Sequence, residues 1–247
     1  MDDPLPNSRR LFLLGSGGLA SGLMLSACAA RGEGQGAGST ENPEKAKEVT
    51  ANEDLMREHG VLRRALLVYH LTAAKLRTGA ASSVPAAPLN QTALLFRRFG
   101  EDYHERKLEE PYIFPILARQ GGASATLVNV LLAQHERGRE ITDHIIGATG
   151  TGRIAATAAE PLARALEAMV LMYQEHTARE DTVVFPAWKQ ALSGAQYDEM
   201  NDKFEEIEHQ MFGEDGFADA VKQIAAIEET LGLADLAQFT APPPVRV

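Results

Sequence analysis

The chain has 247 residues, with 34 Asp and Glu against 24 Lys and Arg, so its formal net charge is −10. This length allows one or two domains with a sizeable core, and the acidic balance argues against nonspecific nucleic-acid binding, which needs a cationic surface. The single cysteine excludes a disulfide framework and any metal site built from several thiolates.

Residues 1–27 predict an export signal that is removed from the mature protein. Arg9 and Arg10 precede a short apolar run with four glycines, which is too weak for a membrane-spanning helix. The Ser-Arg-Arg-x-Phe-Leu pattern resembles the twin-arginine export motif, whose pathway carries folded proteins. Residues 25–28, Leu-Ser-Ala-Cys, resemble a bacterial lipobox. We therefore expect a periplasmic or cell-surface protein that is lipid-anchored to a bacterial membrane through Cys28; the alternative is that Cys28 is an incidental small residue of the signal.

The rest of the chain divides by composition into three parts. Residues 28–49 hold Gly, Ala, Glu, Ser and Lys with almost no large apolar side chains, which predicts a flexible tether. Residues 50–192 are expected to form a helical bundle. Residues 193–247 are expected to form a C-terminal helical extension with a proline-rich tail.

Apolar residues at helical spacing predict four long helices and two shorter ones. Pro111 and Pro115 should kink the second helix in its last third. Four long helices with short loops favour an all-α, up-down-up-down four-helix bundle with additional C-terminal helices. The expected ranges are 51–78, 89–119, 124–148, 160–192, 195–212 and 217–231.

Two segments of the second and fourth predicted helices resemble each other. Residues 103–117 and 173–188 each contain a His, then acidic residues, then Phe-Pro. When the two Phe-Pro pairs are aligned, Glu109 matches Glu180 and the acidic residues that follow also match, Glu110 with Asp181. The histidines are then one position out of register.

Four of the seven histidines fall at nearly one depth of the predicted bundle. With a rise of about 1.5 Å per residue, they lie roughly 12–24 Å from helix ends that meet in an antiparallel arrangement. Random placement would seldom produce such a layer, so we expect a shared site. Each long helix supplies one of these histidines: His59, His104, His135 and His176.

Carboxylates accompany two of these histidines. His176 and Glu180 are four residues apart and share a helix face. His104 and Glu109 are five apart, roughly 140° around an ideal helix, so both point inward only on a broad face or where Pro111 loosens the turn. Buried carboxylates need a cation, and His and carboxylate donors without thiolate suit iron, manganese or zinc. Carboxylates that bridge favour a pair of metals.

Other charged residues are expected to play structural or surface roles. Glu101 with His104 and Glu206 with His209 match the Glu-x-x-His pattern of ferritin-like di-iron sites, but that alternative leaves the other histidines of the layer unused. Three histidines are expected outside the site: His70, His144 and His209. Four charged residues of the third helix are expected to form a solvated face: Glu136, Arg137, Arg139 and Glu140.

At these residues the sequence resembles the hemerythrin, or HHE cation-binding, family over about residues 52–190. The resemblance implies a four-helix bundle around a non-haem di-iron centre, in which two iron ions are expected in preference to manganese or zinc. It further implies that this centre binds dioxygen or a related small ligand, with a role in oxygen binding, sensing or iron handling. It also implies that the four histidines are terminal ligands, that Glu109 and Glu180 bridge the irons, and that Glu105 is a further ligand. The matching features are Glu58-His59, His104 with Glu109 and Phe114-Pro115, His135, and His176-x-x-x-Glu180 with Phe185-Pro186.

Two positions depart from the oxygen-carrying members of the family. Those proteins place a second His four residues after the first on the third helix, where this chain has Arg139, and their second-helix pair is His-x-x-x-Glu. An enzyme that acts on peroxide, nitric oxide or ferrous iron at the same centre is therefore an alternative, and a structural bundle without metal is another. No nucleic-acid partner is expected, and membrane contact is expected only through the lipid anchor.

Overall fold

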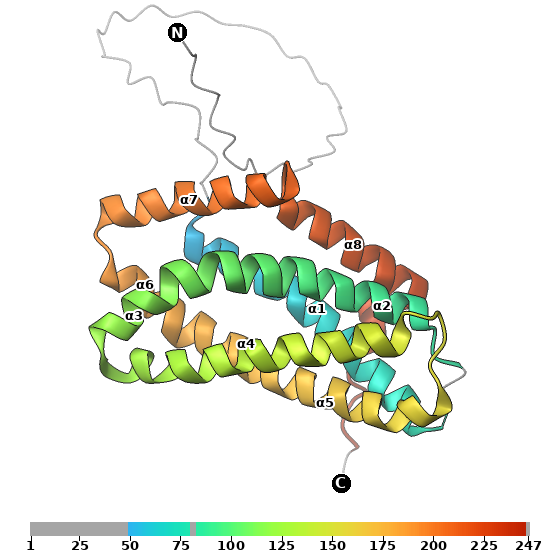
Figure 1. Ribbon diagram of the computed structural model, residues 1–247. Helices are drawn as coiled ribbons and strands as arrows, with labels where there is room; N and C mark the ends of the chain where they lie inside the picture. Colours follow the sequence, from blue (N-terminus) through green and yellow to red (C-terminus); the bar gives the residue numbers. More distant parts are fainter. Residues whose placement is uncertain (1–48, 80–82, 246–247) are drawn as a thin grey trace, which may run out of the picture. The chain divides into compact units, whose positions relative to one another are not determined.

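Four helical arms run alternately in opposite directions around one core in the computed structural model, which describes residues 49–79 and 83–245 (Figure 1). Each arm packs against the next, and the fourth packs against the first. The predicted all-α bundle with extra helices is confirmed. The first and third arms are α1 (Ala51–Arg77) and α4 (Gly122–Thr149). The second arm comprises α2 (Ala86–Leu95), η2 (Phe96–Ile113) and α3 (Phe114–Gln120), and the fourth α5 (Ala156–Arg179), η3 (Glu180–Val184) and α6 (Phe185–Ala191).

The second and fourth arms each contain a π-helical stretch where the sequence predicted one continuous helix. At the end of η2 the N–H of Phe114 donates to the carbonyl of Glu109, five residues earlier, and at the end of η3 Phe185 does the same to Glu180. A π turn holds more residues than an α turn. Of the two prolines expected to kink the second arm, Pro111 lies inside η2 and Pro115 lies in the first turn of α3.

Two further helices cover one side of the bundle. Both α7 (Gly194–Phe212) and α8 (Gly216–Leu231) pack against α1, and a short 3₁₀ turn, η4 (Leu236–Phe239), follows. A capping box at Ser193 and Gln196 starts α7. Trp188 of α6 stacks on Phe204 of α7 with ring centroids 5.6 Å apart, so α7 closes the end of the core next to α6.

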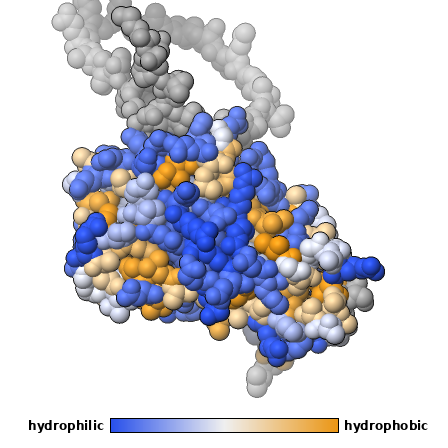
Figure 2. Space-filling model, in the orientation of Figure 1, coloured by the Kyte–Doolittle hydropathy of each residue, from blue (hydrophilic) through white to orange (hydrophobic). Residues whose placement is uncertain are grey.

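Polar residues cover much of the remaining surface. On the face where α4 lies, Figure 2 shows a hydrophilic band across the middle of the bundle. Within the described residues, no helix is long and apolar enough to cross a membrane. The twin-arginine-like signal, Cys28 and all but the last residue of the tether lie outside the described residues.

Candidate metal centre

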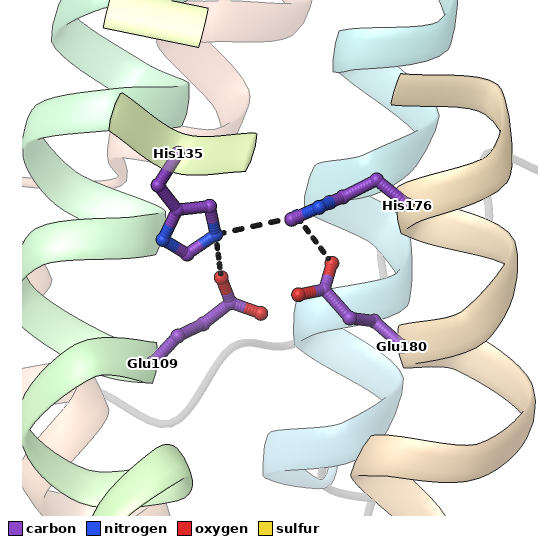
Figure 3. Close-up of side chains that lie close together, drawn as sticks. All are labelled: Glu109, His135, His176 and Glu180. Carbon is purple, nitrogen blue, oxygen red and sulfur yellow. Dashed lines mark hydrogen bonds and ion pairs between the residues drawn. The ribbon is translucent and has the colours of Figure 1, made fainter. Parts of the chain in front are cut away.

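The four histidines of the predicted layer converge in the middle of the bundle, one from each arm, and each is at most 3% exposed. On one side, Nε2 of His135 lies 3.2 Å from Nε2 of His176 and 3.3 Å from Oε2 of Glu109. Nε2 of His176 lies 3.0 Å from Oε2 of Glu180, so two imidazoles and two carboxylates face one point (Figure 3).

The other two histidines, His59 and His104, also face these two carboxylates. Nε2 of His104 lies 3.4 Å from Oε1 of Glu109, and Nε2 of His59 lies 3.5 Å from Oε2 of Glu180. Glu109 therefore directs one oxygen toward each pair of histidines. Donor atoms held by one ion at about 2.0–2.2 Å lie roughly 3 Å apart, which is the spacing seen here.

Every one of these histidines has a polar partner on its other ring nitrogen. Nδ1 of His59 lies 2.7 Å from Oδ1 of Asp181, and Nδ1 of His135 lies 3.0 Å from Oε1 of Glu110. An Nδ1–H that donates to a carboxylate fixes the tautomer and leaves the Nε2 lone pair for a metal. The same orientation holds for the other two.

The imidazoles of His104 and His176 contact residues that directly precede the other two histidines. Nδ1 of His104 lies 2.6 Å from Oε2 of Glu58, and Nδ1 of His176 lies 3.0 Å from Oε1 of Gln134. Glu58 directly precedes His59, and Gln134 directly precedes His135. Neither Glu58 nor Gln134 was predicted to have a role; the signal that could have found them is an acid or amide directly before a candidate ligand.

The Phe-Pro repeat has a structural meaning at this site. Phe114 stacks on His135 and Phe185 stacks on His59, with ring centroids 5.4 Å apart in both pairs. The Phe-Pro alignment matched Glu109 with Glu180, and these two carboxylates occupy equivalent positions in the two halves of the bundle. The histidines miss by one position because the wider π winding holds one more residue between His104 and Glu109.

The buried donors at the centre are short of hydrogen-bond partners. Among the described residues, both oxygens of Glu109, both oxygens of Glu180 and Nε2 of His104 have none. An unsatisfied buried polar group is costly, typically about 1–3 kcal/mol. In addition, His135 and His176 direct Nε2 atoms at each other, and two lone pairs at that distance need a positive charge between them. Metal cations fit this set of nitrogen and oxygen donors.

Protons partly take the place of a cation in the metal-free protein. Burial opposes protonation of His135, but the charge of Glu105 and the nearby carboxylates of Glu109 and Glu110 raise its pKa to about 10. Burial and the neighbouring charge of His135 lower the pKa of His176 to about 3. One proton is therefore held on the His135 side of this pair.

The two carboxylates at the centre likewise have pKa values shifted in opposite directions. The pKa of Glu109 is well below its usual range because the charges of His104 and His135 outweigh its burial. The pKa of Glu180 is well above its usual range because of burial and the charge of Glu109. Like-charge repulsion at this distance is what a bridging cation would relieve.

Glu105 lies beside the centre rather than among the six converging donors. Its Oε1 accepts a 2.6 Å hydrogen bond from the Tyr173 hydroxyl, and its Oε2 accepts a 3.1 Å bond from Arg139. It forms a separate group with Glu110 and His135, on the Nδ1 side of that imidazole.

The expectation that Arg139 belongs to a solvated face is wrong. Arg139 is only 5% exposed and pairs with Glu105, Glu110 and Glu136. It lies four residues after His135 and so shares the inner face of α4. The other three residues of that charged run are exposed: Glu136, Arg137 and Glu140.

The histidines assigned outside the site are exposed: His70, His144 and His209. The ferritin-like alternative fails at Glu206 and His209, because both lie on the exposed side of α7. Its other half, Glu101, is buried and accepts a 2.5 Å bond from Thr142. Burial raises the pKa of Glu101 to about 7, against the effect of the Thr142 hydrogen bond.

Comparison with known proteins places this arrangement in a family. The chain is 43% identical over 239 residues to uncharacterized proteins of Mycobacterium bovis and of two Mycobacterium tuberculosis strains, covering 96% of this chain and 92% of each relative. No solved structure matches it significantly. Residues 50–188 match the family model of the hemerythrin HHE cation-binding domain. The chain therefore belongs to the hemerythrin HHE cation-binding family.

Proposed function

We propose that this protein is an exported, hemerythrin-like non-haem di-iron protein that binds dioxygen or a related small ligand. The observation that carries the proposal is the orientation of Glu109, whose two oxygens face separate histidine pairs at 3.4 and 3.3 Å. A carboxylate that points one oxygen at each of two donor groups suits two metal ions better than one.

The residues divide between two metal positions. His135 and His176 would hold one iron, and His59 and His104 the other, with Glu109 and Glu180 shared between them. Two imidazoles and shared carboxylates supply fewer donors than the six of octahedral iron, which leaves room for a small ligand. Bound iron supplies reversible electron transfer and a Lewis-acidic position for that ligand.

The chain's own residues would prepare the site for this task. Glu58, Gln134, Glu110 and Asp181 fix the imidazole orientations, and such supporting contacts usually strengthen metal affinity by about 10–100-fold. Phe114 and Phe185 cover two of the rings and keep water from that side.

An enzyme acting on peroxide, nitric oxide or ferrous iron is the second candidate function. The observation that favours it is the buried position of Arg139, which stands where oxygen carriers of the family have a further histidine. The guanidinium pairs with Glu105 and Glu110 and donates no electron pair, so a metal held by His135 would keep one more position open to a substrate.

Metal analysis combined with optical spectroscopy tests the proposal. Protein reconstituted anaerobically with ferrous iron should hold about two irons per chain and develop visible absorption on exposure to air. Reversal of this spectrum on removal of oxygen supports a binding protein, whereas sustained consumption of peroxide, nitric oxide or ferrous iron supports the enzyme. A folded, colourless chain without bound iron contradicts both.

Export has its own test. The Arg-Arg pair at residues 9 and 10 and the lipobox-like residues 25–28 support a folded, metal-loaded protein that is carried across the membrane and anchored at Cys28. Exchange of both arginines for lysine should keep the protein in the cytoplasm with its signal attached. Unchanged export of that variant contradicts the proposed route, and Cys28→Ala should release exported protein from the membrane.

A further inference from the structure

The two halves of the bundle match closely except at one position. Arg63 and Arg139 each lie four residues after a histidine of the centre, and each pairs with the acid that supports that histidine, Asp181 or Glu110. Arg63 also contacts Thr177, which follows His176, with Nη2 3.4 Å from the hydroxyl oxygen.

In the other half, the residue that follows the histidine is a carboxylate. Glu105 follows His104, and Nη2 of Arg139 donates to it over 3.1 Å. The protein therefore holds a buried acid on one side of the centre where the other side has a threonine. Glu105 also accepts a hydrogen bond from Tyr173.

Tyr173 contacts both this acid and a histidine of the metal centre. Its hydroxyl donates to Oε1 of Glu105 over 2.6 Å, a length typical of a strong, charge-assisted hydrogen bond. Its ring centroid lies 5.2 Å from that of His176, and the side chain is only 1% exposed. Phe96 covers it edge-on at 4.8 Å.

The neighbouring helix makes room for the phenol. A Cβ atom at Gly138 of α4 would lie 2.2 Å from the Tyr173 hydroxyl and 2.9 Å from two ring carbons. Glycine inside a helix costs roughly 1 kcal/mol relative to alanine. The Tyr173 hydroxyl thus occupies the space that the side chain of any residue other than glycine at position 138 would need.

We propose that Tyr173 is a redox-active tyrosine that gives one electron to the metal centre while its phenolic proton moves to Oε1 of Glu105. This inference rests on the proposed di-iron function and names hydrogen peroxide as the oxidant. Reduction of one peroxide to two waters takes two electrons and two protons. Tyr173 supplies one electron and the iron centre the other, while solvent supplies the two protons.

The geometry provides what such a step needs. A phenol that loses an electron becomes a strong acid, so its proton must have an acceptor already in place. The O–H bond of Tyr173 breaks, the O–H bond of Glu105 forms, and the ring is left as a neutral phenoxyl radical. Arg139 holds the acceptor oxygen pair in position, and burial protects the radical from solvent.

Tyr69 provides a matched control within the same core. It is fully buried and, like Tyr173, packs on Phe96, with ring centroids 6.1 Å apart. Within the described part of the chain, however, its hydroxyl has no hydrogen-bond partner. Tyr69 therefore lacks the proton acceptor that the proposal requires.

The test is electron paramagnetic resonance of iron-loaded protein frozen shortly after addition of hydrogen peroxide. We expect an organic radical signal that narrows when ring-deuterated tyrosine is incorporated. The signal should be lost in Tyr173→Phe and retained in Tyr69→Phe. Glu105→Gln should also lose it, because an amide oxygen accepts the hydrogen bond but does not take the proton.

Metal content and circular dichroism are measured on each sample, which separates the possible results. Loss of the signal in a folded Tyr173→Phe protein with wild-type iron content supports the proposal. Wild-type protein that binds about two irons and reacts with peroxide without a tyrosyl signal, or a signal that survives in Tyr173→Phe, overturns it and leaves the di-iron function standing. A chain that holds no iron overturns both.

Discussion

Replacement of Glu180 by methionine should make the metal-free protein more stable and the metal-loaded protein less stable. Both oxygens of Glu180 are buried without hydrogen-bond partners among the described residues, and burial and the charge of Glu109 raise its pKa well above the usual range. The group therefore destabilises the fold unless a cation is present. Methionine has a similar volume and no polar oxygen to satisfy.

The size of the effect follows from the burial of this carboxyl group. Removal of one unsatisfied buried group should raise the free energy of unfolding by about 1–3 kcal/mol in the presence of a chelator. For a protein of this size, each 1 kcal/mol corresponds to a rise in Tm of about 2–4 °C. With free ferrous iron at 100 times its Kd, the wild-type protein gains about 2.7 kcal/mol, which the variant loses in large part.

Denaturant unfolding followed by circular dichroism, with chelator and with ferrous iron under anaerobic conditions, measures both values. The control is Glu58→Met, at a carboxylate that is equally buried but holds Nδ1 of His104 at 2.6 Å. This control should be less stable than wild type with chelator. If Glu180→Met is also less stable with chelator, then protein contacts hold Glu180 and the argument for a cation is refuted.

Four further predictions concern proton release on metal binding, the pH dependence of stability, Arg139 and Gly138. Metal must displace protons from His104 and His135, whose pKa values are raised despite burial, the second to about 10. Calorimetry in buffers of different ionisation enthalpy should therefore show net proton release when metal binds at pH 7. Iron affinity that does not change between pH 6 and 8 contradicts this. In the metal-free protein, the folded pKa of His135 lies above its unfolded value, and the folded pKa of His176 lies below it, at about 3. The free energy of unfolding should therefore decline as the pH rises or falls from about 6.5, the unfolded pKa of histidine. A free energy of unfolding that stays constant on both sides of this pH is the contrary result. Arg139→Met should lower the free energy of unfolding by about 3 kcal/mol because it leaves Glu105 buried without its cation. The control, Arg137→Met at an exposed site, should change this free energy by at most about 0.5 kcal/mol. Equal effects of the two substitutions would mean that Arg139 is solvated. Gly138→Ala should cost about 1–3 kcal/mol by displacing Tyr173, and the additional change Tyr173→Phe should recover part of the loss, since the hydroxyl is the closest atom; no recovery would mean that the ring rather than the hydroxyl fills the space.

The sequence could predict the bundle and the convergence of donors because both depend on helical spacing. His59, His104, His135 and His176 lie on one layer as the rise per residue requires, and the match between Glu109 and Glu180 followed from the Phe-Pro repeat. The spacing of five between His104 and Glu109 conflicted with an ideal α-helix. The π winding of η2 resolves that conflict by a backbone change that residue spacing alone does not reveal.

The contacts around the centre could not be predicted in the same way, because they join residues of different arms. The partners of the four Nδ1 atoms each lie on another helix, and Arg139 is buried only because two carboxylates of η2 meet it. Tyr173 likewise gains its importance from Glu105 and Gly138, which lie 68 and 35 positions away along the chain. Such pairings follow from tertiary packing, whereas a run of charged residues in the sequence indicates only a solvated face.

The most direct test of the central claim is anomalous X-ray diffraction at the iron edge from crystals of the iron-loaded protein. Two peaks are predicted, one between His135 and His176 and one between His59 and His104, with the carboxylate of Glu109 between them. A single peak, no peak, or a peak confined to the group of Glu105, Glu110 and His135 would contradict a di-iron centre bridged by Glu109.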